Sequence, residues 1–197
     1  MKEYFYEKLL NIKTTGEQQG FHPSLHYHRY EPTPYIVLEE LMANYELKSS
    51  DRIIDFGSGK GRLNFFFHYV AGASVVGVEM NELLCQKALA NMKQYCKKTK
   101  KVQFFCGKAE DYPVDPRDNR FYFFNPFSVE IFRTVVNNLL LSFEKSPREM
   151  ELILYYPADD YVYFLEKYSL FELKLEVDLQ NLIKHDPYER FLIYRFG

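Results

Sequence analysis

Tryptophan is absent from this chain of 197 residues, and cysteine occurs only three times, as Cys85, Cys96 and Cys106. The cysteines form no C-x-x-C pair and are odd in number, which favours reduced thiols in the cytoplasm over disulfides or a zinc site. No apolar run is long enough to span a membrane, so we expect a soluble protein. The first residues also lack the apolar core of a secretory signal.

The chain has no large excess of charge of either sign: it contains 25 Lys and Arg residues and 27 Asp and Glu residues, for a net charge of −2. This balance argues against a general attraction to nucleic acid, although it does not exclude a local patch. The one basic run, residues 97–101, follows a predicted helix. We interpret it as a solvated helix C-terminus rather than a phosphate-binding patch. Most of the 17 Tyr and 18 Phe residues are expected in the core.

Short apolar runs alternate with helix-like patterns along most of the chain. Strands are expected at residues 52–56, 74–79, 102–106, 121–124, 151–156, 171–179 and 190–196. Five strand–helix units are followed by two strands with no helix between them, which predicts a mostly parallel sheet with an antiparallel finish. The expected fold class is therefore α/β. We predict a doubly wound, Rossmann-like sheet of seven strands, with an antiparallel C-terminal strand, helices on both faces and an N-terminal helical lid.

The first residues do not fit this alternation. We interpret residues 1–34 as an N-terminal extension and lid, and residues 35–197 as a single globular domain. Thr33 followed by Pro34 predicts a helix start, with Thr33 as the N-cap and Pro34 as the first helical residue.

Three histidines in the lid, His22, His26 and His28, have a spacing that suggests a metal site. No further ligand residues accompany them, and we expect no metal. A polar aromatic flap over a ligand is one use for this segment, and a lid that packs on the sheet for stability alone is an equal alternative. His26 or His28 as a general base is a further alternative.

The chain is organised around residues 52–62, where a short apolar run ends in Asp55 and three glycines follow before a helical pattern. The glycines stand at alternate positions, as Gly57, Gly59 and Gly61. Such a loop lets a ligand approach the backbone and the free N–H groups of the helix. A dinucleotide-binding loop would have a third glycine at position 62, where this chain has Arg62. Because Asp55 would repel a pyrophosphate, the loop favours a nucleoside cofactor that carries an ammonium or sulfonium group.

Glu79 closes the second predicted strand, 24 residues after Asp55. Doubly wound folds place at this point the acid that binds both ribose hydroxyls. The alternative is an acidic residue that is favoured by the dipole of the next helix. With Asp55 and the glycines upstream, ribose binding is the favoured interpretation.

Residues 55–61 and 76–79 together resemble the cofactor motifs of class I (Rossmann-like) S-adenosylmethionine-dependent methyltransferases, and the resemblance extends over about residues 50–197. It implies S-adenosyl-L-methionine as cofactor and S-adenosyl-L-homocysteine as product. The glycine loop would wrap the methionine and ribose, Asp55 would hold the loop and the amino group, and Glu79 would bind the ribose. The implied cofactor contacts are Asp55, Gly57, Ser58, Gly59, Gly61, Glu79, Met80, Ala109, Glu110 and Asn125.

Two parts of the implied cofactor site are less defined. Family members often have an acid and a small residue after the third strand, where they meet adenine. Lys108 stands at the usual place of the acid, so the adenine contact is open between Ala109, Glu110 and Asp111. From the lid, Arg29 would pair with the methionine carboxylate, and Tyr30 and Thr33 would complete the pocket.

Asn125-Pro126-Phe127 ends the fourth predicted strand and resembles the (D/N/S)-P-P-(Y/F) motif of methyltransferases that act on amino or amide nitrogens. In that motif the Asn side chain and the next carbonyl accept hydrogen bonds from the target NH2, and the aromatic ring packs on its plane. Phe127 stands where the motif has its second proline. The alternative is a plain strand end before a helix that Ser128 caps. Tyr156, at the end of the next strand, lines the same edge.

The sequence thus predicts a cytoplasmic S-adenosylmethionine-dependent methyltransferase with Asn125, Pro126 and Phe127 as catalytic residues. A nitrogen acceptor is favoured, in RNA, in a protein side chain or in a small molecule. The rivals are a small-molecule O-methyltransferase and a non-catalytic domain that binds the cofactor or a partner. No membrane partner is expected, and the choice between a monomer and a homodimer stays open.

Overall fold

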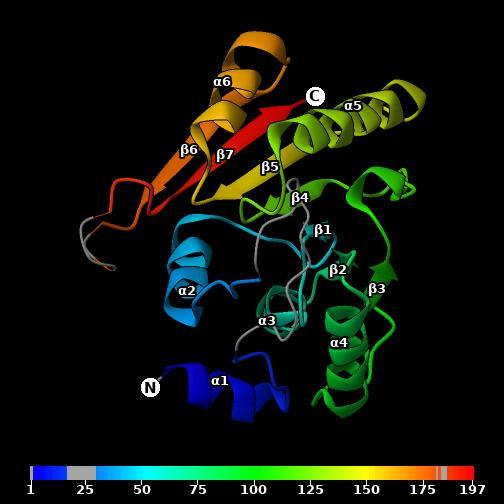
Figure 1. The fold of residues 1–197 in the computed structure, drawn as a ribbon, viewed down its shortest axis with the longest axis vertical. Helices are drawn as coiled ribbons and strands as arrows, with labels where there is room; N and C mark the ends of the chain where they lie inside the picture. The colour runs from blue at the N-terminus through cyan, green and yellow to red at the C-terminus, as the bar shows by residue number, and fades with distance from the viewer. Residues whose placement is uncertain (1, 17–29, 181, 183–185) are drawn as a thin grey trace.

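One mixed sheet runs through the molecule (Figure 1). The computed structural model describes residues 2–16, 30–180, 182 and 186–197. The strands are β1 (Arg52–Phe56), β2 (Ser74–Glu79), β3 (Val102–Cys106), β4 (Arg120–Phe123), β5 (Met150–Tyr155), β6 (Glu172–Asp178) and β7 (Arg190–Phe196). The helices are α1 (Lys2–Leu10), α2 (Tyr35–Asn44), α3 (Arg62–Ala71), α4 (Glu82–Gln94), the short 3-10 helix η1 (Ala109–Asp111), α5 (Val129–Lys145) and α6 (Asp159–Tyr168).

The strand order is β3-β2-β1-β4-β5-β7-β6, which confirms the predicted fold class. Strands β1 to β5 run parallel to one another, and β7 runs antiparallel to both β5 and β6. The order reverses between β1 and β4, and open α/β sheets bind their ligands at the carboxyl ends of the strands at such a point.

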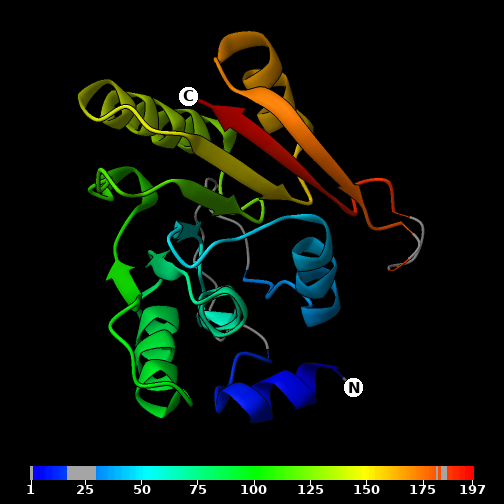
Figure 2. The same ribbon diagram turned by 180° about the vertical axis from the view of Figure 1, so that it is seen from behind.

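Alternate residues of each strand enter two separate cores. Ile53 of β1 packs with α1, α2 and α3, whereas its neighbour Ile54 packs with α5 and α6. This alternation follows from the two-residue period of a strand. Figures 1 and 2 show α5 and α6 on the far side of the sheet from α1, α2 and α3, so the prediction of helices on both faces is confirmed.

The N-terminal residues pack into the first of these cores. Leu10 and Ile12 are buried beside α3. The predicted cap of α2 is wrong by one residue: the helix begins at Tyr35, and Pro34 is its N-cap. The backbone N–H of Tyr35 donates to Glu3 Oε1 at 3.0 Å, and the Thr33 hydroxyl lies 2.8 Å from the Tyr122 hydroxyl instead of capping the helix. Tertiary partners thus replace the local cap.

The expectation of three reduced thiols is wrong for two of them. Cys85 of α4 and Cys106 at the end of β3 form a disulfide, with their Cα atoms 5.9 Å apart, whereas Cys96 is free and exposed. The pairing of β3 with β2 places Cys106 opposite Glu79, and α4 begins shortly after Glu79. Helix α4 therefore returns Cys85 to the end of β3, a closeness that no local spacing of the cysteines encodes.

The basic run lies at the amino end of β3. Lys97 Nζ donates to the Tyr69 carbonyl at 3.1 Å, and Lys101 Nζ donates to the Gly72 carbonyl at 2.7 Å, where α3 ends. This placement agrees with a structural use of the run at a helix C-terminus. In the described part of the chain, no helix is long and apolar enough to cross a lipid bilayer.

Candidate active site

A hollow opens at the carboxyl ends of β1 and β4, where the strand order reverses. One wall consists of residues 30–33, which we call the wall segment, and the opposite side is the glycine loop after β1. The lining residues are Tyr30, Glu31, Pro32, Thr33, Asp55, Gly57, Ser58, Arg62, Leu63, Tyr122 and Phe124. Five residues predicted to bind a cofactor, at positions 30, 33, 55, 57 and 58, thus lie around one space.

The glycine loop turns sharply between β1 and α3. Gly57, Gly59 and Gly61 have φ values of 83°, 55° and 84°, a region that side-chain-bearing residues rarely adopt. The N–H groups of Gly57 and Ser58 donate to the Val78 carbonyl of β2 at 2.9 and 3.1 Å. A Cβ atom at Gly59 would fall inside the Tyr30 ring. Glycine is therefore required at position 59 both by the turn and by the wall segment.

Glu79 ties the loop to the end of β2. Its Oε2 accepts a hydrogen bond from the Gly59 N–H at 2.8 Å, and its Oε1 accepts one from the Asn81 N–H at 2.7 Å. Burial raises the pKa of Glu79, and these backbone hydrogen bonds partly oppose the rise. The N-cap of α4 is Asn81, whose Oδ1 accepts from the N–H groups of residues 83 and 84. Asn81 therefore caps α4, and Glu79 binds the glycine loop.

Asp55 lies beneath the hollow with 4% of its surface exposed. Asn64 of α3 holds this carboxylate, and its amide is oriented so that both its nitrogen and its oxygen have partners. Asn64 Nδ2 donates to Asp55 Oδ2 at 3.0 Å, and Asn64 Oδ1 accepts from the Gly77 N–H at 2.9 Å. Burial raises the pKa of Asp55 well above its ordinary value, and the nearby charge of Glu79 raises it further. The loop thus presents two buried carboxylates that repel one another.

The end of β4 lies beside the loop. Asn125 has a φ of 39°, and Pro126 packs so closely on Gly57 that a Cβ there would approach Pro126 Cβ to 2.7 Å. The Phe127 ring instead enters the core, 6.1 Å from the Phe123 ring and with 1% of its surface exposed. Of the three predicted catalytic residues, Asn125 and Pro126 are therefore near the hollow. The placement of Phe127 favours the packing alternative over stacking on a substrate.

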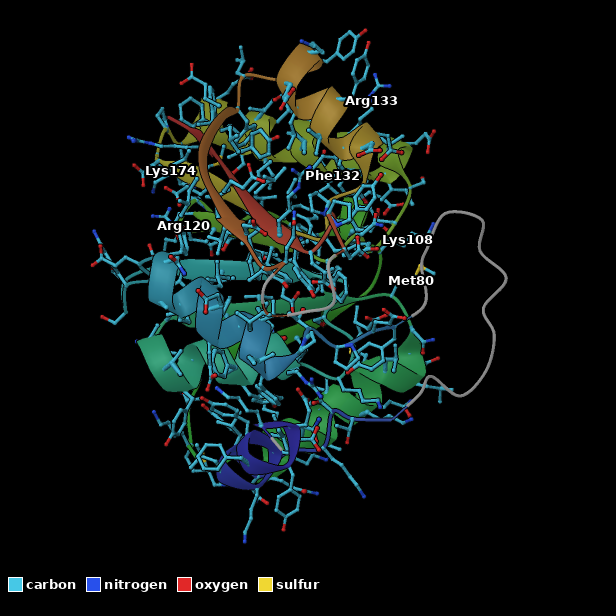
Figure 3. All side chains as sticks on the ribbon, turned by 90° about the vertical axis from the view of Figure 1, so that its left-hand side faces the viewer. Met80, Lys108, Arg120, Phe132, Arg133 and Lys174 are labelled. Atoms are coloured by element: carbon cyan, nitrogen blue, oxygen red, sulfur yellow. A yellow bond between two sulfur atoms is a disulfide. The ribbon has the colours of Figure 1, made fainter. Side chains whose placement is uncertain are left out.

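The adenine-side candidates lie at the same edge of the sheet but do not line the hollow. Met80 follows β2, and Ala109 and Glu110 form η1 after β3. Figure 3 shows Met80 and Lys108 on one side of the molecule and Arg120 and Lys174 on the other. Gly61 caps α3, behind the hollow.

Some predicted residues cannot be placed. Arg29 and the three lid histidines lie outside the described residues. Among the residues that the structure does describe, no group of three His, Cys, Asp or Glu side chains could hold a metal ion.

Arg62 and Asn64 are two polar residues at or beneath the hollow that sequence reasoning did not assign to the site. Arg62 stood out only as a missing glycine, yet it lines the hollow with 4% of its surface exposed. Asn64 lies two residues later on a buried helix face, where a polar residue at an apolar position was the only available signal.

The doubly wound sheet, with its glycine loop after β1 and buried carboxylates at the ends of β1 and β2, is a Rossmann-like α/β fold. The family model described as a methyltransferase domain matches residues 34–152, more than half of the chain. This protein therefore belongs to that methyltransferase-domain family.

Solved structures share the fold at low sequence identity. An RNA methyltransferase of Salinibacter ruber, in complex with S-adenosyl-L-homocysteine, is 19% identical with a TM-score of 0.56, over 84% of this chain and 92% of its own. A putative RNA methyltransferase of Pyrococcus horikoshii is 19% identical with a TM-score of 0.59, over 91% and 92%. A putative methyltransferase of Streptococcus mutans, in complex with SAH, is 16% identical with a TM-score of 0.60, over 84% and 100%. No curated protein matches the chain in sequence.

Proposed function

We propose that this protein binds S-adenosyl-L-methionine at the carboxyl ends of β1 and β2 and catalyses transfer of its methyl group. The observation that carries the proposal is the buried pair Asp55 and Glu79. Burial raises the pKa values of both carboxyl groups, and no cation among the described residues opposes that rise. Two such carboxylates favour a ligand with its own positive charge. The cofactor has an ammonium and a sulfonium group, and when bound it supplies the methyl on the sulfonium.

The residues around the hollow suit the parts of this cofactor. Asp55, at the hollow, would take the ammonium group, and the backbone of residues 57–61 would surround the methionine. The Glu79 carboxylate accepts hydrogen bonds from the N–H groups of Gly59 and Asn81, and with about four acceptor sites it can also accept one from a ribose hydroxyl. Met80, Ala109 and Glu110, at the ends of β2 and β3, are the candidates for the adenine side. Structural relatives that were solved with bound S-adenosyl-L-homocysteine support the choice of cofactor.

For the acceptor, we favour a nitrogen that Asn125 and the Pro126 carbonyl would orient. Asn125 adopts a left-handed backbone conformation, which is uncommon outside glycine and recurs at functional sites, and Asn is among the residues that tolerate it best. Catalysis would then rest on alignment of the lone pair with the methyl group, and no general base would be needed. Tyr156, which also has a positive φ of 48° and directly follows β5, would border the acceptor.

The acceptor molecule is the open part of this proposal. Two of the structural relatives are described as RNA methyltransferases, one of them as putative, which makes a nucleobase a natural first choice. A protein amide and a small amine offer the same NH2 group. A transfer assay with labelled methyl groups on separated RNA, protein and small-metabolite fractions decides between them.

The same assay tests Asn125. We expect Asn125→Ala to slow methyl transfer about 100-fold, because orientation of the reacting nitrogen is lost. Asn44→Ala is the matched control, since Asn44 is exposed on α2 and bonds only within its own helix. Equal rates for the two variants would contradict the role of Asn125. Cofactor binding without transfer to any fraction would favour a non-catalytic binding domain.

A further inference from the structure

Arg62 stands where a positive charge is doubly unfavourable. It is the first residue of α3, where the helix dipole is already positive, and it is buried. A buried charge destabilises a fold unless partners compensate it. The identity of those partners therefore indicates why arginine stands at this position.

The charge is compensated by α1. Arg62 Nη1 lies 2.5 Å from Glu3 Oε2, and Arg62 Nη2 lies 3.7 Å from Glu7 Oε1. The guanidinium carbon also lies 4.5 Å from the centre of the Tyr35 ring, at the start of α2. All of these partners come from the N-terminal 35 residues, far from α3 in sequence.

The remaining guanidinium contacts reach the wall of the hollow. Arg62 Nε donates to the Thr14 hydroxyl at 2.8 Å, and Arg62 Nη1 donates to the Thr33 carbonyl at 3.2 Å. The Thr14 carbonyl in turn accepts a hydrogen bond from the Tyr30 hydroxyl at 2.9 Å. One side chain thus connects to both ends of the wall segment, directly at Thr33 and through Thr14 at Tyr30.

Glu7 fixes Thr14 in the place that this arrangement needs. Its Oε1 accepts hydrogen bonds from the Thr14 N–H at 2.6 Å, the Thr14 hydroxyl at 2.7 Å and the Thr15 N–H at 2.7 Å. From the glycine loop, Lys60 Nζ donates to the carbonyls of Thr15 and Gly16, both at 2.8 Å. Residues 14–16 are therefore held between α1 and the loop.

We propose that Arg62 is a positioning residue, through which Glu3 and Glu7 of α1 hold the wall segment against the glycine loop. Cofactor affinity then depends on carboxylates of a helix that lines no part of the hollow. This inference rests on the proposed function, because the cofactor is the ligand that the wall segment would contact.

The test compares two conservative variants that both loosen α1. Glu7→Gln removes one of the two carboxylate charges that face Arg62. Glu39→Gln removes a carboxylate of α2 that binds Lys2 and Tyr6 of α1 and does not contact Arg62. The probe is S-adenosyl-L-homocysteine, titrated by calorimetry into each folded variant. We expect Glu7→Gln to bind it about tenfold more weakly than the wild type and Glu39→Gln to bind it within about twofold.

Turnover supplies a readout that a purely structural role would not change. In Glu7→Gln the KM for S-adenosyl-L-methionine should rise while kcat at saturation stays the same. Arg62→Lys keeps the charge but loses the planar guanidinium group, and its KM should lie between those of Glu7→Gln and the wild type. Equal affinities for Glu7→Gln and the wild type would overturn the inference. A wild-type protein that does not bind the probe would instead contradict the proposed function itself, so the two failures are distinguishable.

Discussion

Buried carboxylates occur at both ends of the parallel strands, which we call the amino edge and the carboxyl edge. Among the described residues, Glu151 at the amino edge has cations as partners, whereas Asp55 and Glu79 at the carboxyl edge have none. There, Glu151 is fully buried, and it lies 3.5 Å from Arg120 Nε and 2.5 Å from Lys174 Nζ. The Tyr45 hydroxyl donates to the same carboxylate. At the carboxyl edge, Asp55 and Glu79 are also buried, with 4% and 9% of their surfaces exposed, but their hydrogen-bond partners are amide groups. Figure 3 shows Arg120 and Lys174 on the side away from Met80.

The difference separates two uses of a buried charge. A carboxylate that is neutralised within the fold contributes to the folded state, and its removal leaves unpaired cations behind. Carboxylates with raised pKa values and no cation are a cost to the folded state, which a cationic ligand can offset. The amino edge is therefore expected to govern stability and the carboxyl edge to govern binding.

The largest effect is expected at the amino edge. Glu151→Ala leaves Arg120 and Lys174 without their shared partner, and we expect the free energy of unfolding to fall by about 3 kcal/mol. Urea denaturation measures this change. The variant should bind S-adenosyl-L-methionine as the wild type does wherever it is folded. A loss of affinity in folded Glu151→Ala would break the division between the edges.

A smaller effect is expected from pH at the carboxyl edge. Burial raises the pKa values of Asp55 and Glu79, so in the free protein they ionise above the ordinary carboxyl range. A cationic ligand favours the ionised forms, lowers their pKa values and releases protons on binding. Affinity should therefore rise with pH by at most about tenfold per unit for each group, and level off above the raised pKa values.

Calorimetry between about pH 5 and pH 8 checks this dependence. The stability of the free protein changes with pH in the opposite direction. The contribution of these two groups to stability is present below the ordinary carboxyl pKa and is lost as pH rises through the raised pKa values. Glu79→Gln should flatten both trends. An affinity that is independent of pH in the wild type would show that neither carboxylate changes its ionisation on binding.

The sheet could be predicted from sequence because its signals are local. Apolar runs, glycines and helical periodicity are read within about ten residues, and every strand lies within one residue of its predicted bounds. The glycine loop and Glu79 are also local signals, since each stands where a strand ends. Asp55, Gly57 and Ser58 meet at the hollow for that reason.

The features that sequence reasoning missed depend on distant partners. Arg62 is explained by Glu3 and Glu7, and the start of α2 by Glu3, all on a helix that precedes the sheet. The Cys85–Cys106 disulfide depends on the return of α4 over β3. The Phe127 ring could be placed only once its neighbours in the core were known. A local pattern does not contain such contacts.

The central claim is that the Asp55–Glu79 edge is a site for a cationic nucleoside cofactor. Titration of S-adenosyl-L-methionine into the wild type and into Glu79→Gln, at neutral pH, tests it most directly. The account predicts one site per chain in the wild type and an affinity at least about tenfold lower in the variant, because hydrogen bonds to a charged group are lost. Equal affinity in the two proteins, or no binding to the wild type, would contradict it.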